Sequence, residues 1–171
     1  MEESEPMPSL PNFVVQVMDL PAEGITLEGE VPVREFEFED DGRFALEGAT
    51  LRYRLHVSLV KRTVFVMGRL ELDTQAMCDR CTEWAPLHLT EPEVIHSIAD
   101  ETLEPVDFTE DIREDVVLML PTSFLCKEEC LGICPTCGKN LNEGPCGCER
   151  SPSEDDEDSP WAALSGLQDK M

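Results

Sequence analysis

Six of the eight cysteines lie within the short segment CKEECLGICPTCGKNLNEGPCGC. In the motif Cys134-Pro-Thr-Cys137, two intervening residues let both thiolates face one ion, as in a zinc knuckle. The following glycine permits a tight turn. Four thiolates complete a tetrahedral zinc site and leave no open position, so a site of this kind is structural rather than catalytic. The predicted zinc ligands are Cys134, Cys137, Cys146 and Cys148.

The other four cysteines leave several interpretations open. Cys126 and Cys130 are alternative ligands of the same site or half of a second site. Upstream, Cys78 and Cys81 also have two-residue spacing, and they could complete a site with the downstream cysteines, form a redox pair of the thioredoxin type, or pack as buried thiols. A redox CxxC opens a helix in a βαβ unit, whereas residues 82–89 look extended. We therefore disfavour redox catalysis.

The charge of the chain restricts its partners. Thirty-seven acidic residues against 13 basic ones give a formal net charge of -24. Such a chain repels phosphate backbones and anionic membranes as a whole. The start MEESEPMP lacks the basic and apolar order of a secretory signal, so we expect a cytoplasmic protein whose clustered cysteines stay reduced.

Residues 51–70 depart from this acidic background, because they contain five cations and no acid. On adjacent strands these cations are candidate RNA contacts, with Tyr53 or Phe65 near the bases. The interpretation we favour is a solvated face that balances acidic neighbours at residues 30–41 and 100–115. The five cations are Arg52, Arg54, Lys61, Arg62 and Arg69.

The elements that must position these residues follow from periodicity. Apolar and polar residues alternate over residues 51–59, and a second apolar run covers residues 63–74, which predicts a β-hairpin with a bulge at Gly68. Further strands are expected at residues 13–18, 31–38 and 87–98. A helix over residues 110–120 would be capped by Thr109 and ended by Pro121.

The predicted fold is α+β: a hairpin-rich antiparallel β-sheet, a few short helices and a small cysteine-rich zinc-knuckle module near the C-terminus. We expect a flexible N-terminus (1–9), a β-rich domain (10–125), a metal-binding module (126–150), an acidic linker (151–159) and a docking helix (160–171). His56, His88 and His96 have no partner at ligand spacing, and no motif specifies an active site. The sequence therefore predicts a protein that is not an enzyme.

The motifs together resemble one family. They are Cys78-Asp-Arg-Cys81 after a hairpin, the helix ending in VVLMLP, the cluster CLGICPTCGKNLN with its trailing CGC, and the terminal SPWAALSGL. In this order they resemble the YceD-like family of large ribosomal RNA subunit accumulation proteins, over roughly residues 10 to 170. The resemblance implies a metal-binding, cytoplasmic-type bacterial or organellar protein needed for accumulation of 23S ribosomal RNA.

The charge favours one mechanism for such a role. Ribosomal proteins are basic, so an acidic chain can steer and hold them. We expect a non-enzymatic ribosome biogenesis factor that contacts a ribosomal protein or a pre-ribosomal particle, with direct rRNA contact confined to residues 51–70. No membrane or small-molecule substrate is expected. The alternatives are a thiol-disulfide redox protein that uses Cys78 and Cys81, and an RNA-processing enzyme with a site that the sequence does not reveal.

Overall fold

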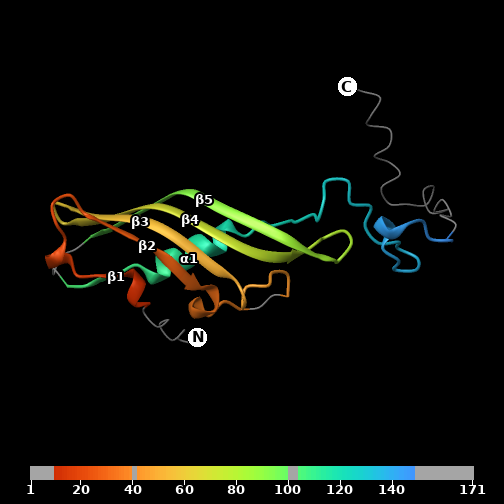
Figure 1. Ribbon diagram of the computed structural model, residues 1–171, viewed down its shortest axis with the longest axis horizontal. Helices are drawn as coiled ribbons and strands as arrows, with labels where there is room; N and C mark the ends of the chain where they lie inside the picture. The colour runs from red at the N-terminus through yellow and green to blue at the C-terminus, as the bar shows by residue number, and fades with distance from the viewer. Residues whose placement is uncertain (1–9, 40–41, 100–103, 149–171) are drawn as a thin grey trace, which may run out of the picture.

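A computed structural model describes residues 10–39, 42–99 and 104–148. Its main element is a four-stranded antiparallel sheet of order β2-β3-β4-β5 (Figure 1). The strands are β2 (Ile25–Pro32), β3 (Thr50–Val60), β4 (Thr63–Met77) and β5 (Trp84–Ala99). A short pair, β1 (Val14–Val15) and β6 (Val106–Asp107), forms a second sheet beside it. The predicted α+β fold with a mostly antiparallel sheet is confirmed.

The predicted hairpin at residues 51–74 is the centre of this sheet. β3 and β4 pair without interruption from Thr50 opposite Asp73 to Val60 opposite Thr63. The predicted bulge is also present, because the pairing of β4 with β5 shifts register between Gly68 and Leu70. A Cβ at Gly68 would lie 2.1 Å from the backbone oxygen of Arg54, so only glycine fits between the strands there.

The core lies on one face of the sheet, where alternate residues of β3 and β4 are buried. Helix α1 (Thr109–Met119) covers this face and buries Ile112 and Val116 (Figure 1). His96 on β5 holds the helix, since its Nε2 lies 2.7 Å from Asp115 Oδ2. The largest fully buried side chains are Phe13, Phe36, Phe108, Leu51, Leu55, Leu70, Leu72 and Ile112.

Two expected strands were largely wrong. At residues 31–38, β2 ends at Pro32 and a 3-10 helix, η3 (Val33–Phe36), follows. Val33 and Phe36 are three residues apart, so one 3-10 turn directs both into the core. The apolar spacing that suggested a strand therefore belongs to a turn. Of residues 13–18, only β1 is strand, between the 3-10 helices η1 (Pro11–Phe13) and η2 (Val17–Asp19).

The helix expected at residues 110–120 is α1, displaced by one residue. Its predicted cap differs, because Phe108 occupies the N-cap position and Thr109 is the first helical residue. The Asp107 carboxylate accepts hydrogen bonds from the Thr109 backbone N at 2.9 Å and from its Oγ1 at 2.6 Å. Within the described residues, no helix is long and apolar enough to span a bilayer. The expected N-terminal tail (1–9), acidic linker (151–159) and docking helix (160–171) fall outside the described residues.

Candidate metal centres

The cysteines form two groups of four beyond the end of the sheet where β4 turns into β5 (Figure 1). In each group the four sulfur atoms lie within 4.8 Å of one another. We call Cys78, Cys81, Cys126 and Cys130 the first cluster, and Cys134, Cys137, Cys146 and Cys148 the second cluster. All eight cysteines are free thiols.

The first cluster joins segments that are distant in the sequence. Cys78 and Cys81 lie in the turn between β4 and β5, where Thr82 N donates to Cys78 O at 2.9 Å. The chain after α1 docks on this turn, because Asp79 N donates to Phe124 O at 2.9 Å and Phe124 N donates to Asp79 Oδ2 at 2.8 Å. This docking brings Cys126 and Cys130 to the hairpin. The first cluster therefore takes two cysteines from each side of the predicted boundary between residues 125 and 126.

The sulfur distances of the first cluster suit a tetrahedral ion. Cys78 Sγ lies 3.8 Å from Cys130 Sγ, and Cys81 Sγ lies 3.6 Å from Cys126 Sγ. An ion with four sulfur ligands at about 2.3 Å separates those sulfurs by about 3.8 Å. Because the CxxC pair lies in a hairpin turn and not at the start of a helix, it lacks the setting that a thioredoxin-type pair requires.

The second cluster is local. Cys134 N donates to Lys139 O at 2.8 Å and Gly138 N donates to Cys134 O at 2.9 Å, which forms the tight turn expected of a knuckle. Gly138 has φ +71°, a left-handed conformation that favours glycine. A 3-10 helix, η4 (Leu141–Glu143), then returns the chain to Cys146 and Cys148. The structure thus places together the four sulfurs that the sequence predicts as one ligand set.

The thiols of each cluster differ in acidity. In the first cluster, burial opposes ionisation of Cys78, yet backbone hydrogen bonds from Cys126, Cys81 and Arg80 lower its pKa to about 6. Burial and neighbouring thiols raise the pKa of Cys126 to about 12. Nearby thiols resist becoming anions together, and a bound divalent cation favours the thiolate form of all of them.

The second cluster shows the same division. Backbone hydrogen bonds from Cys137 and Thr136 lower the pKa of Cys134 to about 6. A hydrogen bond with Cys137, together with burial, raises the pKa of Cys148 to about 12. Both clusters therefore have the donor type and the spacing that can hold a metal ion.

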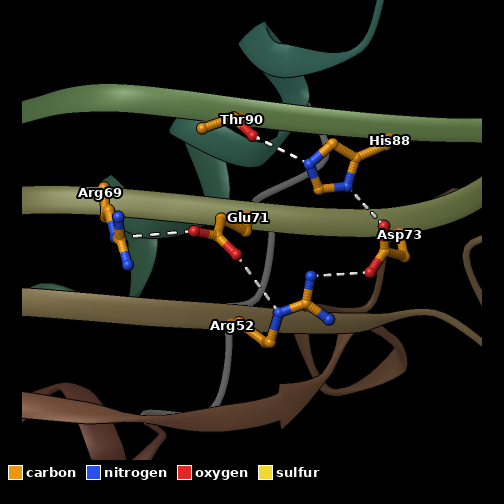
Figure 2. A network of polar contacts seen from close by, with 6 residues as sticks. All are labelled: Arg52, Arg69, Glu71, Asp73, His88 and Thr90. Atoms are coloured by element: carbon orange, nitrogen blue, oxygen red, sulfur yellow. Dashed lines mark hydrogen bonds and ion pairs between the residues drawn. The ribbon is translucent and has the colours of Figure 1, made fainter.

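The cations of residues 51–70 are largely engaged within the molecule. Arg52 lies 2.7 Å from Asp73 and 3.5 Å from Glu71, and Arg69 lies 3.6 Å from Glu71. Figure 2 shows the pairs of Arg52 crossing from β3 to β4 and the pair of Arg69 along β4, on the sheet face opposite the core. The nearby Arg54 pairs with Glu28 at 3.7 Å. These pairs reduce the positive charge that this face offers to a phosphate backbone.

The network continues onto β5. His88 Nδ1 lies 2.5 Å from Asp73 Oδ1, and His88 Nε2 lies 3.2 Å from Thr90 Oγ1 (Figure 2). The hydrogen bonds of His88 and Arg52 hold the pKa of Asp73 below its ordinary value. Lys61 and Arg62 lie in the exposed turn between β3 and β4.

A groove of about 870 Å³ lies between residues 34–39 and 42–49 on one side and the ends of β4 and β5 on the other. Phe38, Phe44 and Leu46 contribute apolar wall, and the half-exposed Trp84 lies at the start of β5. The acidic lining residues are Glu37, Glu39, Glu47 and Asp73. Sequence reasoning missed this groove, because residues 37–39 and 42–49 carry no periodic signal and only the fold brings them to Trp84.

Comparison with known proteins agrees with the sequence motifs. Residues 90–168, which include the six downstream cysteines, match the family described as "Large ribosomal RNA subunit accumulation protein YceD". An uncharacterized protein of Mycobacterium tuberculosis is 30% identical over 145 residues, 68% of this chain and 69% of that protein. An uncharacterized protein of Mycobacterium bovis is similar to the same extent.

A plant protein extends the comparison. The Large ribosomal RNA subunit accumulation protein YCED homolog 1, chloroplastic, of Arabidopsis thaliana is 30% identical over 69 residues, which cover 40% of this chain and 20% of that protein. No solved structure matches the chain. On the family match and these relatives, the chain belongs to the YceD family of large ribosomal RNA subunit accumulation proteins.

Proposed function

We propose that this protein is a non-enzymatic ribosome biogenesis factor that supports the accumulation of 23S ribosomal RNA by holding a basic protein partner. The family description and the name of the plant relative support the first part, since both refer to accumulation of the large ribosomal RNA subunit. The charge distribution supports the second part. The partner is a ribosomal protein, free or within a pre-ribosomal particle, and the contact serves the synthesis, processing or stability of the RNA.

The partner proposal rests on one observation: several basic side chains are paired within the chain, whereas most acidic side chains cannot be. Arg52, Arg54 and Arg69 each contact a carboxylate of the same chain. Because 37 acidic residues share 13 cations, most carboxylates have no cation to pair with. The unpaired charge produces a negative potential that accelerates the approach of a basic protein and holds it at low salt.

The groove offers a place for such a partner to dock. Among the described residues, Glu37, Glu39 and Glu47 form no ion pair, and they surround apolar wall. Trp84 adds an aromatic face, to which lysine and arginine side chains bind through cation–π contacts. A basic, extended segment fits this combination of acidic rim and aromatic wall.

We also propose that each cluster holds one structural zinc ion. Four thiolates favour zinc or iron over harder cations, and a closed four-sulfur site leaves no position for substrate. The first cluster would fix the turn that precedes Trp84, since Cys78 N donates to Glu83 O at 2.9 Å. Metal analysis of the full chain should give two zinc ions, and Cys146→Ser should remove about one of them. Iron in place of zinc, or no metal, would refute this proposal.

The partner proposal is tested by co-purification of the full chain over a salt titration, with identification of the bound protein and RNA. We expect ribosomal proteins or pre-ribosomal particles at low salt, released as salt increases. Recovery of no ribosomal protein, particle or rRNA at low salt would refute the proposal. The groove is tested with Glu37, Glu39 and Glu47 all replaced by Gln, which should weaken capture.

The matched control replaces three exposed acids outside the groove, Glu23, Glu30 and Glu35, by Gln. It removes the same charge, so an effect of total charge alone would weaken capture equally in both variants. Equal weakening would therefore reject the groove as the docking place and leave only general electrostatic attraction.

A further inference from the structure

Asn142 belongs to the loop of the second cluster but contacts the first. It lies in η4, between Cys137 and Cys146. Its Nδ2 donates to Cys130 Sγ at 3.3 Å, and its Oδ1 accepts from Leu131 N at 3.0 Å. Both polar atoms of this one amide therefore contact the end of the first cluster.

The side chain is held in this position. Asn140 Oδ1 accepts from Asn142 N at 3.0 Å and from Asn142 Nδ2 at 2.8 Å. Asn140 also pairs with Ile133 in an isolated antiparallel bridge, and Leu141 N donates to Gly132 O at 2.8 Å. These bonds fix η4 against residues 131–133, the three residues that separate Cys130 from the second cluster.

The same three residues contact the turn of the first cluster. Ile133 N donates to Arg80 O at 3.1 Å, and Arg80 Nη1 donates to Cys130 O at 3.1 Å. A Cβ at Gly132, which has φ +75°, would lie 3.0 Å from Arg80 O. Residues 131–133 thus pack between the two sites, with Arg80 on one side and η4 on the other.

We infer that Asn142 couples the two clusters, so that an ion bound in the second cluster raises the affinity of the first. The inference rests on the proposed binding of a metal ion by each cluster. An ion held by Cys137 and Cys146 closes the loop that contains η4 and reduces the freedom of Asn142. The amide donor is then already in place when Cys130 binds its own ion, so less ordering entropy is lost. By linkage, an ion in the first cluster raises the affinity of the second by the same factor.

The test is a double-mutant cycle on the full chain loaded with cadmium-113, whose NMR spectrum gives one resonance for each four-sulfur site. The four proteins are the wild type, Asn142→Ala, a variant with Cys137 and Cys146 both replaced by Ser, and the combination. Each is titrated with a chelator, and loss of the first-cluster resonance gives the affinity of that site. Resonances are assigned from the variant that lacks the second cluster.

We expect Asn142→Ala to weaken the first cluster by roughly 10- to 100-fold, the usual effect of removing an outer hydrogen bond to a ligand. Disabling the second cluster should weaken the first by a similar factor, and the combination should weaken it no further than the larger single effect. Factors that multiply in the combination, or no effect of Asn142→Ala, would refute the coupling.

Two more variants distinguish an effect of the Asn142 amide donor from an effect of the η4 turn in which it lies. Asn142→Asp keeps an acceptor for Leu131 N but replaces the donor with an anion near Cys130, so the first cluster should weaken at least as much as in Asn142→Ala. Glu143→Gln changes the exposed neighbour in η4 and should leave both resonances unchanged. If the wild type binds no cadmium, the metal proposal itself fails. If the wild type binds two cadmium ions and Asn142→Ala loses neither of them at a lower chelator concentration than the wild type, only the coupling proposal fails.

Discussion

From the ion pairs on the outer face of the sheet we predict a change in RNA affinity and in its dependence on salt. Glu71 and Asp73 hold Arg52 and Arg69 in the network of Figure 2. Replacing Glu71 by Gln and Asp73 by Asn keeps the shapes of the side chains but removes both negative charges. The two arginines then lose their ionic partners and become available to phosphates. We therefore expect this double variant to bind RNA more tightly than the wild type.

The magnitude follows from counterion release. Each phosphate contact with a single strand adds about 0.7 to the slope of log K against log salt. Two released arginines should therefore steepen the slope by about 1.4. The contribution of these two contacts to RNA binding should therefore be about 25-fold larger at 0.1 M salt than at 1 M salt. The gain should shrink as salt increases, because screening weakens phosphate contacts and surface pairs alike.

The assay is fluorescence anisotropy of a labelled single-stranded RNA at several salt concentrations. The control variant, with Glu23 and Glu35 both replaced by Gln, also removes two charges but frees no arginine, since neither residue forms an ion pair within the described part of the chain. For this control, the slope of log K against log salt should equal that of the wild type. Equal gains in both variants would show that only net charge matters. An unchanged affinity in both would show that the freed arginines do not reach phosphates, and either result refutes the reasoning.

Three further changes test the fold. Phe108→Ala removes a fully buried ring and should lower the free energy of unfolding by about 3–5 kcal/mol, measured in urea; a loss below about 1 kcal/mol would contradict its place in the core. Gly68→Ala places a Cβ 2.1 Å from Arg54 O and should cost on the order of 1–3 kcal/mol in the same assay, whereas an unchanged midpoint would reject this close approach. His88 lowers the pKa of Asp73, so this contribution to stability is present above the ordinary pKa of 3.8 and disappears as the pH falls through the lower folded value. Asp73→Asn should flatten this acid dependence in urea titrations, and an unaltered pH profile would contradict it.

Local patterns predicted local structure well. The alternation over residues 51–59 and the apolar run after it gave the hairpin of β3 and β4, because a strand with one buried face imposes a period of two. The acidic first turn and Pro121 placed α1 within one residue at each end. The apolar residues at 31–38 were misassigned, since a 3-10 turn also buries residues three apart.

The two cysteine clusters differ in the same way, because one is formed by residues close in the sequence and the other by distant segments. The second cluster draws on residues 134–148, so spacing predicted its four sulfurs as one ligand set, while Cys126 and Cys130 stayed open as alternative ligands. The first cluster needs residues 45 to 52 positions apart, and the choice among its alternatives depended on how the chain after α1 returns to the hairpin. Sequence spacing contains no information about that return.

By itself the sequence determined the charge, the sheet-forming hairpin, the helix and the ligand type of the candidate metal sites. These depend on composition and on contacts between near neighbours, which a periodic pattern records. Only the tertiary structure decided that Cys78 and Cys81 join Cys126 and Cys130, that arginines of the basic strands pair with carboxylates, and that Trp84 meets an acidic groove. Each of these depends on segments far apart in the chain, which packing of the sheet, α1 and the cysteine-rich segment brings together.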